Sequence, residues 1–103
     1  MNELLEILEE IKKRPQLYLG RKSLELLNAF ISGFYVCQCR YQNRHLNITE
    51  YYLSGFQTFI EQKYNLDTTH SWSSLIRFFC SSDEEAFDKF YVLLNEYLLL
   101  DKN

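Results

Sequence analysis

Cysteine and histidine are the side chains of this 103-residue chain best suited to hold a metal ion or attack a substrate. Cys37 and Cys39 lie two positions apart in a predicted helix, so they point to different sides of it and are poorly placed to form a disulfide. Cys80 stands alone, and His45 and His70 fall in predicted loops. Zinc sites need closely spaced pairs of such ligands. We therefore predict free thiols, no metal ion and no cofactor.

The sequence leaves a catalytic thiol open, because a cysteine and a histidine that are distant in the chain can meet in the fold. Cys80 precedes a predicted helix start at Ser82, and such a position can lower the pKa of a thiol. The alternative is that Cys80 only closes the short helix before it. We favour this second, structural interpretation.

Three acids, Glu84, Glu85 and Asp88, cluster at the start of the last predicted helix. Catalytic carboxylates of glycosidases face each other across a cleft at a defined separation. These three instead lie at one helix start, where the helix dipole already favours negative charge. We predict that the protein is not an enzyme.

Charge is unevenly distributed along the chain, whose formal net charge is −3. Residues 1–25 carry equal numbers of acids and bases, whereas residues 67–103 carry seven acids and three bases. The net charge of −3 argues against a nucleic-acid binder held by phosphate contacts, which needs clustered Lys and Arg, so we predict no nucleic-acid partner. The acidic last third is either a solvated helix face or a surface that attracts a basic protein.

Few glycines and prolines, three and one, favour long helices over a sheet. Apolar residues recur at helical spacing in five segments, which predict an all-α, compact bundle of about five helices in a single domain, 1–103. The predicted helices span residues 3–14, 24–42, 48–64, 72–79 and 83–99.

Helix boundaries are predicted from proline, glycine and capping residues. Pro15 ends the first helix, and Gly20 turns the connector that begins at Arg14. The predicted N-caps are Ser23, Asn47, Ser71 and Ser82, the last with Glu85 as its capping-box partner.

Inward-facing residues are predicted from the same spacing. Helix 24–42 is expected at the centre of the bundle, and its Gly33 predicts a close helix crossing. Its inward stripe is Leu27, Phe30, Ile31, Phe34, Cys37 and Tyr41. The inward residues of helix 72–79 are Trp72, Leu75, Ile76 and Phe79.

The first residues of the chain and its apolar runs indicate where the protein resides. The first ten residues are acidic and lack the basic start of a secretory signal. No apolar run approaches the roughly 20 residues that a membrane span needs. We therefore expect a cytoplasmic protein without a membrane partner.

Several short segments follow one another in a distinctive order and spacing across roughly residues 3–98. They are Lys13-Arg14-Pro15, Tyr18-Leu19-Gly20, Ser23-Leu24, Phe30-Ile31-Ser32-Gly33, Ser71-Trp72, Glu84-Glu85-Ala86-Phe87, Phe90 and Leu93-Leu94. This layout resembles that of small bacterial immunity proteins encoded beside polymorphic toxins, including contact-dependent growth inhibition systems. Gln16 replaces the glycine that usually follows the proline in those proteins.

The resemblance implies a toxin inhibitor in the cytoplasm of the producing cell. Its partner would be the cognate C-terminal toxin domain of a large secreted protein, a nuclease and in particular an RNase, bound by a monomer in a 1:1 complex that occludes the active site. A nuclease cleft is basic, so acids beside exposed aromatic rings would suit the inhibitor. The expected binding residues are Asp83, Glu84, Glu85 and Asp88, with Tyr91 and Tyr97 as anchors on condition that they are exposed.

Another function fits the same helical stripes and surface aromatic residues. The chain can be a small helical adaptor or regulator that binds a partner other than a toxin, and it can act as a homodimer.

Overall fold

The predicted all-α architecture is confirmed in residues 3–41 and 55–101, which the computed structural model describes. Six helices and no strand occur in these two ranges. They are α1 (Glu3–Lys13), α2 (Pro15–Leu19), α3 (Leu24–Tyr41), α4 (Phe56–Lys63), α5 (Trp72–Phe78) and α6 (Asp83–Asp101). Among the described helices, none has both the length and the apolar character needed to cross a membrane.

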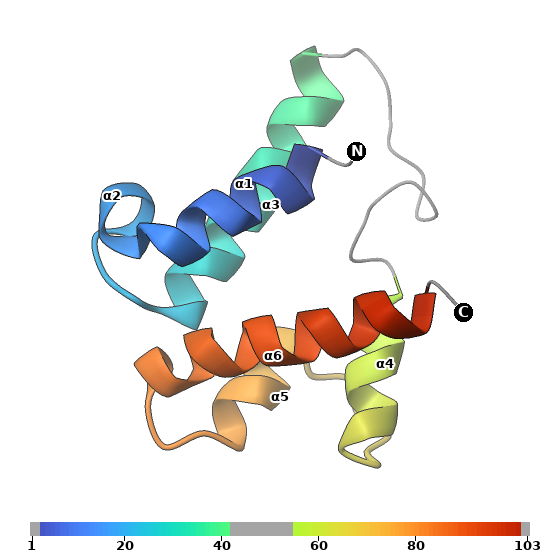
Figure 1. Ribbon diagram of the computed structural model, residues 1–103. Coiled ribbons are helices and arrows are strands. Elements are labelled where there is room, and N and C mark those ends of the chain that lie inside the picture. Colours follow the sequence, from blue (N-terminus) through green and yellow to red (C-terminus); the bar gives the residue numbers. More distant parts are fainter. Residues whose placement is uncertain (1–2, 42–54, 102–103) are drawn as a thin grey trace.

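Helix α6, and not the predicted helix 24–42, lies at the centre of the described fold. In Figure 1, α1 and α3 occupy the upper half, α6 crosses below them, and α4 and α5 lie beneath α6. Helix α6 contacts α3, α4 and α5, because its buried residues face more than one side. The prediction failed because the last turns of α3 carry no core side chains: Cys37 is exposed, and the exposed fraction of Tyr41 is 86%.

The predicted connector contains a short helix, α2, that the sequence analysis missed. Arg14 has non-helical φ and ψ of −137° and 62°, so α1 ends before Pro15, as predicted. Helix α2 begins at Pro15, because proline is tolerated at the first position of a helix, where a backbone N–H would have no partner within the helix. Gly20 ends α2 with φ at 88°, the left-handed conformation predicted for it.

Two of the predicted N-caps are confirmed by their hydrogen bonds at the starts of α5 and α6. The Ser71 hydroxyl accepts from the Ser74 N–H at 3.3 Å, and the Ser82 hydroxyl accepts from the Glu85 N–H at 3.0 Å. The return bond of the capping box is shifted by one residue, because the Glu85 carboxylate accepts from the Ser81 N–H at 2.7 Å. Asn47 and residues 48–54 of the predicted third helix lie outside the described residues, and α4 ends within one residue of the prediction.

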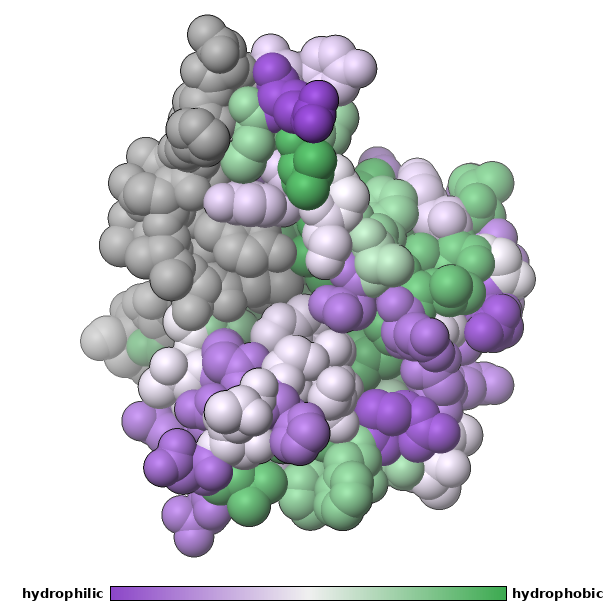
Figure 2. Space-filling view, turned by 180° about the vertical axis from the view of Figure 1, so that it is seen from behind, coloured by the Kyte–Doolittle hydropathy of each residue, from purple (hydrophilic) through white to green (hydrophobic). Residues whose placement is uncertain are grey.

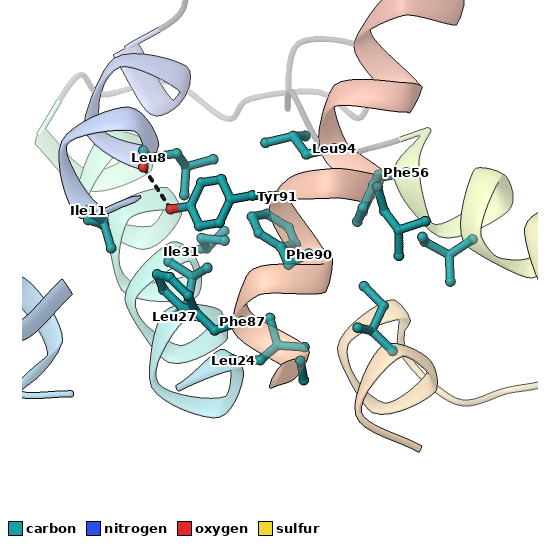
Figure 3. Packing of buried hydrophobic residues seen from close by; sticks show 14 of the residues in the cluster. Leu8, Ile11, Leu24, Leu27, Ile31, Phe56, Phe87, Phe90, Tyr91 and Leu94 are labelled. Carbon is teal, nitrogen blue, oxygen red and sulfur yellow. Dashed lines mark hydrogen bonds between the residues drawn. The ribbon is translucent and has the colours of Figure 1, made fainter. Parts of the chain in front are cut away.

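The core lies on both sides of α6 (Figure 3). Leu8 and Ile11 of α1 and Ile31 of α3 pack on one side, and Phe56 of α4 packs on the other. The inward residues predicted for helix 72–79 are wrong at Phe79, which follows the end of α5 and is 49% exposed.

Gly33 and Gly55 should respond to alanine in opposite directions. A Cβ at Gly33 would meet no described atom within 4 Å, so no described helix makes the predicted close crossing there. Gly33→Ala should therefore stabilise α3 by about 0.5–1 kcal/mol. A Cβ at Gly55 would lie 2.5 Å from the Tyr97 hydroxyl oxygen, and Gly55→Ala should cost about 1–2 kcal/mol. Urea unfolding of both variants measures the difference, and equal shifts of one sign would contradict the prediction.

Candidate functional site

Asp83, a predicted toxin-binding residue, is built into the junction between α6 and α3. Its carboxylate accepts hydrogen bonds from the N–H groups of Leu24, at 3.0 Å, and Glu25, at 3.2 Å, and from the buried hydroxyl of Ser23. The Ser23 hydroxyl in turn accepts from the Leu26 N–H at 3.0 Å, which confirms Ser23 as the N-cap of α3. Asp83 therefore satisfies the free amides at the start of a helix roughly sixty residues earlier in the chain.

The surroundings of Asp83 favour its charged form. Partial burial opposes ionisation, but the hydrogen bonds from Ser23, Glu25 and Leu24 outweigh it and lower the pKa of the Asp83 carboxyl. The charge of Arg77 acts in the same direction. Asp83 is thus an ionised structural group rather than a free surface acid.

Two further predicted acids also have partners within the fold. The Glu85 carboxylate accepts from both the hydroxyl and the N–H of Ser81, and these bonds lower its pKa. Asp88 forms an ion pair with Lys22, with 2.8 Å between Oδ1 and Nζ. Of the four predicted acids, only Glu84 has an exposed side chain that forms no hydrogen bond or ion pair with another described residue.

The two predicted aromatic anchors face the core. Tyr91 is buried, and its hydroxyl donates to the backbone carbonyl oxygen of Leu8 at 2.7 Å (Figure 3). Desolvation by burial raises the pKa of its hydroxyl, and the negative charge of Glu9 raises it further. Tyr97 is half-buried, and its ring lies 5.6 Å from that of Phe56 and 5.5 Å from that of Phe59. The condition of exposure therefore fails for Tyr91.

The three thiols and His70 lie apart from any metal-ligand cluster in the part of the chain that the structure describes. All three cysteines are free, and among the described residues no cluster of three potential metal ligands occurs. Partial burial and the charge of Glu85 raise the pKa of the Cys80 thiol despite nearby Lys89 and Arg77, which is opposite to the shift that a nucleophile needs. His70 is exposed, and His45 lies outside the described residues.

An aromatic surface at the end of α5 and just after α4 was not predicted from the sequence, and two of its three rings are exposed. This aromatic face consists of Tyr64, Phe78 and Phe79. Phe78 is 80% exposed and its ring makes an edge contact with Phe79, which stacks on Tyr64 with 4.5 Å between ring centroids. The available signal was the adjacent pair of phenylalanines, because two neighbours on a short helix cannot both face one core.

An open groove adjoins the aromatic face. It has a volume of about 560 Å³ and lies between the start of α3, helix α5 and the start of α6. The lining residues include Leu24, Glu25, Ser74, Arg77, Phe78 and Asp83. In Figure 2, hydrophobic side chains gather at the lower edge of the molecule, at the level of α4 and α5.

The geometry defines the site only as a candidate surface for binding another protein, with apolar rings beside carboxylates. Comparison of the chain with protein-family models, curated proteins and solved structures gives no match.

Proposed function

We propose that the protein is an immunity protein, which binds and neutralises the toxin domain encoded beside it. The layout of its sequence segments supports this class of protein. The observation that carries the proposal of a protein partner is the aromatic face, because Phe78 exposes 80% of its surface instead of joining the core. Large exposed aromatic residues that adjoin one another are typical of protein-binding sites.

The rings of the aromatic face have the properties of residues that contribute most of the binding energy at an interface. Phe78 and Phe79 touch each other, and the stack of Phe79 on Tyr64 restrains the rings before a partner arrives. Pre-organised rings lose little conformational entropy on binding, and burying them removes a large apolar area from water.

Carboxylates beside the aromatic face support a basic partner, such as the cleft of a nuclease. Glu25 lines the same groove as Phe78, and Glu84 follows Asp83 at the start of α6. Arg77 also lines the groove and donates to the backbone carbonyl of Cys80 at 3.2 Å. Its one positive charge stands against the two carboxylates of Glu25 and Asp83, so the groove lining is net negative by one. We therefore propose Phe78, Glu25 and Glu84 as toxin-binding groups. They replace the predicted acids Asp83, Glu85 and Asp88, whose carboxylates already have partners within the fold.

In this proposal a monomer covers the active site of an RNase toxin in a 1:1 complex in the cytoplasm of the producing cell. The aromatic rings contribute most of the affinity, and the carboxylates speed the encounter and orient the partner. No group of the inhibitor needs to react, since covering a catalytic cleft is enough to stop the toxin.

Phe78→Ala should weaken toxin binding by about tenfold or more, close to 1.4 kcal/mol, because it removes the most exposed ring of the proposed interface. Its unfolding midpoint should stay near that of the wild type. Tyr41→Ala is the matched control, since Tyr41 is an aromatic residue with an exposed fraction of 86% on α3. Calorimetric titration of the toxin domain with each variant measures the affinities.

Two outcomes would contradict different parts of the proposal. If Tyr41→Ala weakens binding and Phe78→Ala does not, the aromatic face is not the interface. If cells that lack this protein survive production of the neighbouring toxin domain, the immunity function is wrong.

The second candidate function is a homodimeric helical adaptor, which is favoured by exposed apolar residues on α6. Val92 and Leu100 are 50% and 62% exposed, respectively. Light scattering at high protein concentration tests the dimer, and a monomer there would exclude this version.

A further inference from the structure

A basic surface lies at the α1 end that adjoins α2, and it is separate from the aromatic face. Residues 12–22 contain five basic residues and no acid. Residues 1–25 as a whole have a net charge of zero. Within them, however, acids and bases are segregated, because four of the five acids precede residue 12 in α1. The fold thus places a positive region on a protein whose formal net charge is −3.

Part of this basic segment lines an open groove between the α1–α2 corner and α6. The groove has a volume of about 450 Å³. Its lining includes Lys12, Lys13, Lys22, Asp88, Val92 and Asn95. Three lysines against one aspartate leave the lining with an excess of positive charge, and Val92 adds an apolar side chain that is 50% exposed.

Two of these lysines are positioned by the aromatic side chains of α6. The Lys12 ammonium lies 5.6 Å from the centroid of the Tyr91 ring, and the Lys22 ammonium lies 5.8 Å from that of Phe87. Both rings belong to buried residues that are fixed in the core. Such cation–π contacts restrain long side chains, so less entropy is lost when an anion binds.

We infer that this groove binds an acidic polypeptide segment. Carboxylates of the segment would pair with Lys12 and Lys13, an apolar side chain would cover Val92, and the Asn95 amide would bind the peptide backbone. Charge complementarity argues for this occupant. The inference does not rest on the proposed immunity function, because it concerns a different face and any partner with an acidic segment.

A polynucleotide fits this groove less well than a short acidic peptide. A neighbouring groove shares Lys13 and Asn95 but is also lined by Glu6, Glu9 and Glu10. A long polyanion that extended into this neighbouring groove would therefore meet carboxylates. A short acidic segment can end before them.

Asp88 acts as an internal competitor for this groove. Its carboxylate already pairs with Lys22, with 2.8 Å between the charged atoms, and both side chains lie in or beside solvent. Neutralising Asp88 would release Lys22 for an incoming carboxylate. A residue that only stabilises the fold would not strengthen binding when it is changed.

Fluorescence anisotropy with a fluorescein-labelled hexaglutamate peptide at low salt tests the inference. We expect Lys12→Gln to weaken binding about fivefold and Asp88→Asn to strengthen it about threefold, because the two variants change the charge of the groove in opposite directions. Lys89→Gln is the matched control, since Lys89 lies next to Asp88 but does not line the groove, and its effect should stay within about twofold.

Unfolding midpoints first establish that all variants are folded, so that changes in peptide affinity can be assigned to the groove. Opposite shifts for Lys12→Gln and Asp88→Asn, with little change for Lys89→Gln, support the inference. Absence of peptide binding overturns it, as do equal effects of Lys12→Gln and Lys89→Gln. Tighter binding of an RNA hexamer than of the peptide also overturns it and would assign the groove to phosphates. None of these results depends on whether the aromatic face binds a toxin.

Discussion

Phe56→Ala should lower the free energy of unfolding by about 3–5 kcal/mol, the range for truncating a fully buried aromatic ring. Phe56 has an exposed fraction of 0%, and its ring makes edge contacts with Trp72, Phe90 and Tyr97 at centroid distances of 5.3–5.7 Å. Together with Phe56 these rings come from three helices, so one truncation would leave a cavity where α4, α5 and α6 meet.

The unfolding of Phe56→Ala can be followed through the single tryptophan, Trp72, whose ring packs against Phe56 and Phe90. Phe78→Ala is the matched control, because it removes an equal ring that is 80% exposed and should change stability by less than about 0.5 kcal/mol. Equal losses for the two variants would contradict the core position of Phe56.

Asp83→Ala should destabilise the protein by about 2–3 kcal/mol at pH 7, since three donors lose an ionised acceptor. The Leu24 and Glu25 amides and the Ser23 hydroxyl all donate to Asp83, and Ser23 is completely buried. The variant therefore loosens both the start of α3 and its junction with α6. Urea unfolding at pH 7 measures the loss.

The contribution of Asp83 should also depend on pH. Its hydrogen bonds lower its pKa in the folded state despite partial burial, whereas an unfolded aspartate titrates near pH 3.9. The stabilisation is therefore fully present above about pH 4 and is lost as the pH falls through the lower folded-state pKa. Asp83→Ala should show a shallower loss of stability in this acid range than the wild type.

Glu84→Ala is the control for Asp83→Ala. Glu84 is the next acid of the same helix turn, but its side chain is exposed and forms no hydrogen bond or ion pair with another described residue. Its removal should change stability by no more than about 0.5 kcal/mol. If both variants lost the same stability, the cap on α3 would not be the cause.

The distinction between Asp83 and Glu84 matters for experiments on binding. A variant of Asp83 that fails to protect against a toxin can fail because the α3–α6 junction is weakened. Glu84 and Phe78 carry no such ambiguity, because their side chains are exposed. They are the residues at which a loss of binding identifies an interface.

Sequence by itself determined the helical class and several helix ends. These features depend on residues within about four positions of one another: the apolar spacing of α1, the Ser71 and Ser82 caps, and the left-handed turn at Gly20. Such local signals do not need the rest of the fold. The short α2 helix was missed because Pro15 both ends one helix and begins the next.

Only the tertiary structure decided which acids and rings remain available for a partner. Asp83 caps a helix that begins 59 residues earlier, Asp88 pairs with Lys22, and Tyr91 bonds to the backbone of Leu8. The sequence shows each of these side chains as one member of an acidic or aromatic cluster, and their partners come from distant helices. The packing of α5 likewise left Phe78 outside the core. Which side chains can bind a partner depends on the folded surface. Contacts between helices engage some acids and rings within the protein and leave others exposed to solvent.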